Sequence, residues 1–220
     1  MFKGHSFPKE VIQQAVYFKI RFTLSYRDVE ELLSTRGVVV DHATIQRWVF
    51  KFSPLIEVGL KKRRKPSGNS WMMDETYIKV KGEWMYLYRA VDKKGKTVDF
   101  LVPRRRSQMG APKFLLKAIN NNGSPKVINI NESGANKEAI RTYNKRRLKR
   151  IRIRQCKYLN NRVEGDHRFI KRRTAGMLRF KSFESASQTF AGIEIVRMIK
   201  KEQVRFPKAT YFKTFCSLAA

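Results

Sequence analysis

The chain has 220 residues, 42% of them hydrophobic, which is enough to bury one mid-sized core and a smaller one. It carries 48 lysines and arginines against 18 aspartates and glutamates, a formal net charge of +30. This charge favours an anionic partner, nucleic acid above all, whose binding weakens steeply as salt rises. No apolar run approaches the roughly 20 residues of a membrane span, and the N-terminus has no apolar signal segment. We therefore expect an intracellular protein with no membrane partner.

Residues 1–60 are predicted to form a helical DNA-binding domain. Ser25 has the position of a helix cap, and Gly37 of a helix stop. Asp41 then caps a short helix expected over residues 42–51. Two short helices joined by a tight, glycine-led turn are typical of a helix-turn-helix, although an ordinary three-helix bundle with solvated polar residues would have the same pattern. The side chains expected to read base edges are His42, Thr44, Gln46 and Arg47.

A basic linker, residues 61–70 ("KKRRKPSGNS"), is predicted to separate this domain from a core over residues 71–203, with a tail at 204–220. Three aromatic and β-branched runs joined by "KG" and "KKGK" turns open the core and predict an antiparallel meander. Helices and strands then alternate. The fold expected is a mixed α/β (α+β) one, a ribonuclease-H-like five-stranded mixed sheet with flanking helices. The predicted strands span 70–80, 83–92, 97–103, 126–130 and 151–155, and the predicted helices span 107–123, 136–145, 160–176 and 182–203.

Two carboxylates stand out in this basic background. Asp74 lies inside an apolar strand, where burial costs several kcal/mol unless the group is paired or bound to metal. Glu164 shares one face of a basic helix with His167, Arg168 and Lys171. A carboxylate beside such a stripe suits a site that holds a cation and a phosphodiester. The plainer alternatives are an edge strand whose Asp74 faces water and a surface helix with a Glu164–Arg168 pair.

A third ligand is expected where the strand "KVINI" ends, and there the chain has Asn131. Two Mg²⁺ ions about 3.5–4 Å apart need several oxygen ligands. An asparagine offers one neutral carbonyl oxygen in place of a charged carboxylate. Glu132 is the next residue, but strand alternation turns it away from Asp74.

Long stretches of the chain closely resemble bacterial insertion-sequence DDE transposases of the insertion-sequence-six family. They include "SYRDVEELLSTRGVVVDHATIQRWVFKF", "WMMDETYIKVKGEWMYLYRAVDKKGKTVDFLV" and "QCKYLNNRVEGDHRFIKRR", and the similarity runs from about Phe2 to Gln203. The resemblance implies a catalytic Asp-Asp-Glu triad that binds two Mg²⁺ ions, with Mn²⁺ as a substitute. Asp74 matches the first position, Glu164 the third, and Lys171 the basic residue that follows. The second position, 33 residues before Glu164 (164 − 131), is Asn131.

The resemblance also implies the activity and the partners. The family's enzymes bind double-stranded DNA, both terminal inverted repeats and target, nick it and transfer strands, as a homodimer or higher assembly. The expected location is the bacterial cytoplasm, with the nucleoid. Basic DNA contacts beyond the helix-turn-helix are expected from Arg104, Arg105, Arg106, Arg162, His167, Arg168, Lys171 and Arg172.

Asn131 leaves the activity of this chain open. It can be a degenerate natural residue or an introduced one, and Met72 and Gly165 are further departures from the family pattern. The alternative function is a catalytically dead DNA-binding remnant that competes with active copies. Two more distant alternatives are a ribonuclease acting on RNA–DNA hybrids, which the helix-turn-helix argues against, and a basic structural protein.

Overall fold

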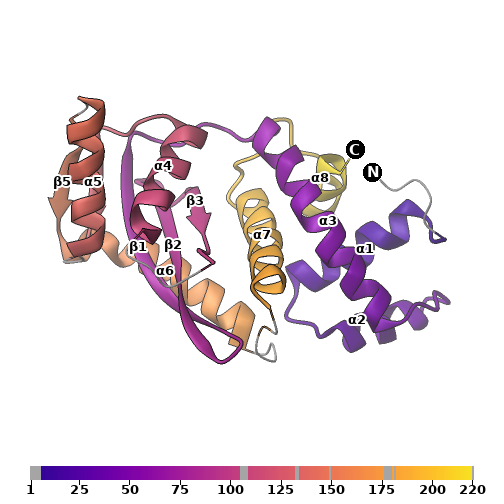
Figure 1. Cartoon of the computed structure of the whole chain (residues 1–220). Helices are drawn as coiled ribbons and strands as arrows, with labels where there is room; N and C mark the ends of the chain where they lie inside the picture. Colours follow the sequence, from indigo (N-terminus) through magenta and orange to yellow (C-terminus); the bar gives the residue numbers. More distant parts are fainter. Residues whose placement is uncertain are drawn as a thin grey trace. The chain divides into compact units, whose positions relative to one another are not determined.

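The computed structural model divides into two compact units (Figure 1). Unit 1 combines both ends of the chain, Met1–Lys65 and Arg173–Ala220, and unit 2 is Pro66–Arg172. None of the helices in the described part of the chain has the length and apolar character of a bilayer span. The residues that the structure describes are 6–104, 109–131, 134–148, 150–175, 180 and 182–219.

Unit 1 is helical. Its helices are α1 (Lys9–Arg21), α2 (Tyr26–Ser34), α3 (His42–Arg63), α7 (Phe183–Lys200) and α8 (Tyr211–Leu218). The expected core (71–203) and tail (204–220) therefore differ from the compact units, because α7 and α8 pack with the N-terminal helices.

The helix caps of unit 1 form where the sequence predicts them. The hydroxyl of Ser25 accepts a hydrogen bond from the backbone N–H of Asp28, whose carboxylate accepts one from the N–H of Ser25. This reciprocal pair satisfies two otherwise unpaired donors at the start of α2. Asp41 caps α3 by accepting from the N–H of Thr44.

Helix α3 is longer than predicted. The sequence pattern favours an end near Lys51, whereas the helix runs to Arg63 and so takes up the start of the expected linker. Phe52, Ile56 and Leu60 continue its apolar stripe and are at most 2% exposed. Their burial stabilises α3 and keeps it continuous past Pro54, where the missing N–H would otherwise favour a break.

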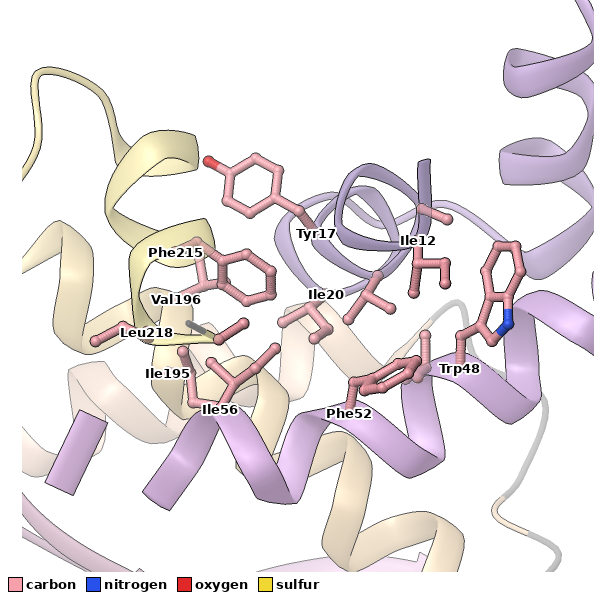
Figure 2. Packing of buried hydrophobic residues seen from close by; sticks show 14 of the residues in the cluster. Ile12, Tyr17, Ile20, Trp48, Phe52, Ile56, Ile195, Val196, Phe215 and Leu218 are labelled. Carbon is pink, nitrogen blue, oxygen red and sulfur yellow. The ribbon is translucent and has the colours of Figure 1, made fainter. Parts of the chain in front are cut away.

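One apolar cluster joins the helices of unit 1 (Figure 2). Ile20 of α1, Phe52 of α3, Ile195 of α7 and Phe215 of α8 meet in it, each at most 4% exposed. α3 and α8 approach so closely that a Cβ on Gly59 would lie 2.1 Å from the carbonyl oxygen of Leu218. The C-terminal helix is thus part of the same core as the first three helices.

Unit 2 holds a five-stranded sheet of order β3-β2-β1-β4-β5. The first three strands pair antiparallel, whereas β4 pairs parallel with β1 and β5 parallel with β4. This order and these directions are those of a ribonuclease-H-like sheet, so the predicted fold is confirmed. The strands are β1 (Ser70–Val80), β2 (Glu83–Asp92), β3 (Thr97–Leu101), β4 (Val127–Ile130) and β5 (Arg152–Gln155).

Helices cover both faces of this sheet (Figure 1). α4 (Gly110–Asn122) and α5 (Gly134–Arg147) lie on one face and pack on Trp71 and Met73. α6 (Lys157–Ala175), of which the part up to Arg172 belongs to unit 2, lies on the other face, which carries Met72 and Asp74. Successive side chains of β1 point to opposite faces, so this strand supplies both layers.

Candidate active site

Asp74 lies on β1 under α6 and is 6% exposed. Its neighbours on the same face, Met72 and Thr76, are buried as well. A carboxylate in this position has lost most of its water and needs other groups to stabilise its charge.

Asn131 supplies one such group. It follows the last residue of β4, and β4 is parallel to β1 with Met72 opposite Asn129. Two residues further along, this register brings residue 131 beside Asp74. The Nδ2 of Asn131 donates a hydrogen bond of 2.6 Å to Oδ1 of Asp74. The structure therefore brings together the first two positions of the predicted triad, while Glu132 lies outside the described residues.

Helix α6 presents two stripes at this point. One stripe is buried inside unit 2 and has the i, i+3, i+4, i+7 spacing of one helix face. It consists of Val163, Asp166, His167 and Ile170. Glu164, Arg168 and Lys171 form an adjacent exposed stripe. This exposed stripe lines an open pocket of about 540 Å³ together with Asp74, Glu75, Thr76, Asn161 and His167. Asp74, Glu164, His167, Arg168 and Lys171, predicted from distant parts of the sequence, thus share one pocket.

The charge on Asp74 is disfavoured in this pocket. Burial, together with the nearby carboxylates of Glu75 and Glu164, raises the pKa of Asp74 to about 7, against the lowering effect of a backbone hydrogen bond. Glu75 points to the other side of β1, where it accepts a 2.6 Å hydrogen bond from Nδ2 of Asn136. The pocket therefore concentrates acidic groups that repel one another in the absence of a cation.

His167 is neutral at physiological pH. Burial, together with the positive charges of Arg89 and Lys171, lowers the pKa of His167 to about 3, against the opposite effect of Asp166. Its Nδ1 lies 3.8 Å from Oδ2 of Asp74, a distance too long for a hydrogen bond. The contact is therefore polar packing rather than an ion pair.

Arg89 and Asp166 form a buried ion pair that the sequence reasoning missed. The side chain of Arg89 is 0% exposed and that of Asp166 7%, and Nη2 of Arg89 lies 3.2 Å from Oδ2 of Asp166. Arg89 is the cross-strand partner of Asp74 in the β1–β2 register. The sequence did contain a signal for the position of Arg89. A two-residue turn at Lys81–Gly82 sets Val80 opposite Glu83, and counting back along both strands from that pair sets Asp74 opposite Arg89.

The residues of this pocket fit a divalent cation, with one departure. Carboxylates and amide carbonyls are the oxygen ligands that Mg²⁺ takes, and Asp74, Glu164 and Asn131 provide both kinds. A cation would also offset the repulsion that raises the pKa of Asp74. The departure is Asn131, whose amide nitrogen, not an oxygen, faces Oδ1 of Asp74. Among the described residues, no group of three or more His, Cys, Asp or Glu is arranged to hold a metal.

The predicted base-reading residues lie in the first turns of α3. Gln46 and Arg47 are exposed. The hydroxyl of Thr44 donates to Oδ2 of Asp41 and accepts from Nη2 of Arg47, both at 2.6 Å. Nδ1 of His42 lies 3.0 Å from a carboxylate oxygen of Glu30 on α2. His42, Thr44 and Arg47 thus have partners within unit 1, and Gln46 and Arg47 are exposed to solvent.

The structure describes only some of the remaining residues that are predicted to contact DNA. Arg104, Arg168 and Arg172 are exposed. Arg105 and Arg106 lie outside the described residues, as does the side chain of Arg162.

Comparison with known proteins identifies relatives along almost the whole chain. The model of a DDE domain matches residues 68–203. The chain is 39% identical over 205 residues to the transposase for insertion sequence-like element IS431mec of Staphylococcus aureus, covering 93% of this chain and 90% of that protein. It is 38% identical, with the same coverage, to the transposase for insertion sequence element IS257 in transposon Tn4003 of the same species.

Among solved structures, the HTLV-2 integrase catalytic core domain in complex with magnesium overlaps 61% of this chain and 88% of its own, at 17% identity and a TM-score of 0.42. The fold assignment rests on the strand order and directions given above.

Proposed function

Because the chain belongs to the DDE transposase family of bacterial insertion sequences, we propose that the pocket between β1 and α6, with Asn131 beside it, is its centre for cutting and joining DNA. The observation that carries this proposal is the convergence of Asp74, Asn131 and Glu164, which lie 57 and 33 positions apart in the chain (131 − 74 and 164 − 131). The substrates are double-stranded DNA, namely the terminal inverted repeats of the element and its target.

The acidic and the basic groups of the pocket have different roles. Asp74, Glu164 and the amide oxygen of Asn131 hold the divalent cations, Mg²⁺ or Mn²⁺, which supply charge neutralisation and an activated attacking oxygen when bound. Arg168 and Lys171 line the same pocket and hold the phosphodiester by its non-bridging oxygens. Buried, neutral His167 packs beside Asp74 and limits the orientations open to that carboxylate.

DNA recognition is assigned to α3. Its first turns carry Gln46 and Arg47 in exposed positions, and both side chains can pair with base edges in the major groove. Arg104 and Arg172 are exposed and contact phosphates without reading sequence. Because two element ends have to be joined, the working form is a homodimer or a higher assembly.

A second function is favoured by one observation, the 2.6 Å hydrogen bond from Asn131 to Asp74. This bond stabilises the buried carboxylate without a cation, which is the role a metal would otherwise fill. A chain with such a site binds terminal repeats and competes with active copies, but does not cut.

Nicking of terminal-repeat DNA in Mg²⁺ or Mn²⁺ tests the proposal, with this chain run beside Asn131→Asp. Binding is measured in parallel by mobility shift in EDTA. If Asn131→Asp nicks and this chain only binds, the triad is assigned and the second function applies. If both nick, the cleaving function applies and Asn131 is tolerated.

The control is Glu164→Gln combined with Asn131→Asp, which has to abolish nicking while leaving binding intact. Nicking that survives this change, or DNA binding that is lost in Gln46→Ala and Glu164→Gln alike, would contradict the assignment of the pocket and of α3.

A further inference from the structure

The β1–β2 hairpin extends well beyond the strands on either side of it. β4 pairs with residues 70–72 of β1, and β3 pairs with residues 88–91 of β2. Within the described sheet, residues 76–87, from the Thr76–Leu87 pair to the turn, therefore form a two-stranded ribbon (Figure 1). Lys81 and Gly82 close it with φ angles of 51° and 84°, as a tight two-residue turn with two left-handed positions requires.

The two faces of this ribbon differ sharply. On one face Ile78, Val80, Met85 and Leu87 are buried, each at most 7% exposed. On the other face the side chains are aromatic and open to solvent, with Tyr77 46% and Trp84 54% exposed. Leaving two large rings half in water forfeits the free energy that their burial would provide, so this face has the character of a binding surface.

The exposed rings belong to a continuous row. The ring centroid of Tyr77 lies 6.4 Å from that of Trp84 and 5.1 Å from that of Tyr86. Tyr86 lies 5.7 Å from Tyr88, which stacks at 6.0 Å on Phe114 of α4, a fully buried side chain. The row thus runs from the core of unit 2 to the hairpin tip, and each ring limits the rotation of the next. A ligand that stacks here meets a surface already held in place.

The charges around the row favour an anionic ligand. Nζ of Lys79 lies 5.5 Å from the ring of Trp84, and Lys81 is exposed at the tip beside Glu83. The chain as a whole carries +30. A nucleic acid provides phosphates for the lysines and flat rings for the aromatic side chains.

The row lies on the face of the hairpin opposite to Asp74. Side chains alternate along β1, and Tyr77 follows Asp74 by three positions, so the two side chains point to opposite sides of the strand. The row is therefore a surface separate from the pocket, on the side of the sheet that carries Phe114 of α4.

We propose that the face formed by Tyr77, Lys79, Trp84 and Tyr86 binds unpaired DNA bases by stacking. This inference rests on the proposed function only in taking DNA as the ligand. It adds a site for bases separated from their complement, distinct from the duplex-reading residues of α3.

Tryptophan fluorescence offers a direct probe. Of the three tryptophans, Trp48 and Trp71 are 4% and 1% exposed, so quenching from the solvent side reports mainly on Trp84. Oligo-dT is titrated into the full chain, and its affinity is measured by the anisotropy of a labelled strand at several salt concentrations. Binding is expected to quench Trp84.

Trp84→Ala is expected to weaken oligo-dT binding about 5- to 150-fold, the effect of losing one stacked base. Because stacking releases no counterions, the slope of log K against log salt stays unchanged, whereas Lys79→Ala lowers it by about 0.7. Trp84→Tyr keeps a stacking ring and should retain most of the affinity. The matched control is Phe206→Ala, which removes an equally open ring, 81% exposed, from unit 1.

Equal oligo-dT affinities for Trp84→Ala, Phe206→Ala and the unchanged chain would overturn the inference. So would quenching of Trp84 by rising protein concentration without DNA, together with a change of sedimentation in Trp84→Ala, which would assign the face to a second copy. Binding to the terminal-repeat duplex is measured alongside. If the duplex binds and Trp84→Ala has no effect, this inference alone fails; if neither DNA binds, the proposed function fails as well.

Discussion

The two faces of the unit 2 sheet are built from the same strands but bury opposite kinds of side chain. Under α4 and α5 lie Trp71, Met73 and Ile128, each at most 1% exposed. Under α6 lie Asp74 and Arg89, which are nearly as inaccessible, at 6% and 0%. Moving one residue along a strand exchanges one environment for the other.

This difference separates the part of the sheet that stabilises the fold from the part that the proposed function uses. An apolar side chain gains free energy from burial without any particular partner. A buried charged or amide group has to find one, as Asp74 does in Asn131 and Arg89 in Asp166. The face under α6 is therefore less stabilising than an apolar face would be, and its polar groups serve the proposed chemistry. Substitutions on the two faces should differ in their effect on the free energy of unfolding and in its dependence on Mg²⁺.

The largest effect is expected at the buried ion pair. Arg89→Met leaves Asp166 without its cation and should lower the free energy of unfolding by about 3–5 kcal/mol. Adding Asp166→Leu removes the stranded charge and should restore most of that loss. Urea unfolding of the two variants measures both. If the single change costs nothing, Asp166 is solvated and the contrast between the faces is wrong.

A smaller effect is expected at Asn131. Asn131→Asp replaces the donor that faces Asp74 by a second carboxylate, so stability in EDTA should fall by about 1–3 kcal/mol. Millimolar Mg²⁺ should restore it, because a cation bound to the folded protein stabilises it by mass action. Thermal unfolding with and without Mg²⁺ is the measurement. Asn120→Asp adds the same charge at an exposed position and should show neither effect.

The smallest effect is expected on the apolar face. Ile128→Val removes one buried methylene and should cost about 0.5–1.5 kcal/mol, with no dependence on Mg²⁺. Urea unfolding of this variant in EDTA and in Mg²⁺ provides the baseline for the polar face. A Mg²⁺ dependence here would mean that the two faces are coupled and not separable.

Local sequence patterns were sufficient for features whose causes are local. Ser25 and Asp41 cap helices where the sequence places them, because a cap is decided within three residues. The three-strand meander followed from its two glycine-containing turns, and the mixed sheet from the alternation after it.

Features decided by distant residues were not predicted. Helix α3 passes the predicted stop because Phe52 and Ile56 pack on α7 and α8, and α8 itself was taken for a tail. In the site, Asp74 and Glu164 were singled out as lone acids in a basic chain, whereas Arg89 and Asp166 were missed. A lone arginine in a basic sequence attracts no notice until the hairpin register sets it opposite Asp74.

The composition of unit 1 from both ends of the chain has a consequence for synthesis. Arg63, the last residue of α3, donates to the carbonyl oxygens of Arg205, Phe206 and Ser217, and Phe215 fills the core beside α1. A chain emerging from the ribosome can complete unit 2, which is continuous, before unit 1. The helix assigned to DNA recognition acquires its full packing only when the last residues are released. A messenger truncated before the codons of α8 would therefore yield a folded sheet with an incomplete unit 1.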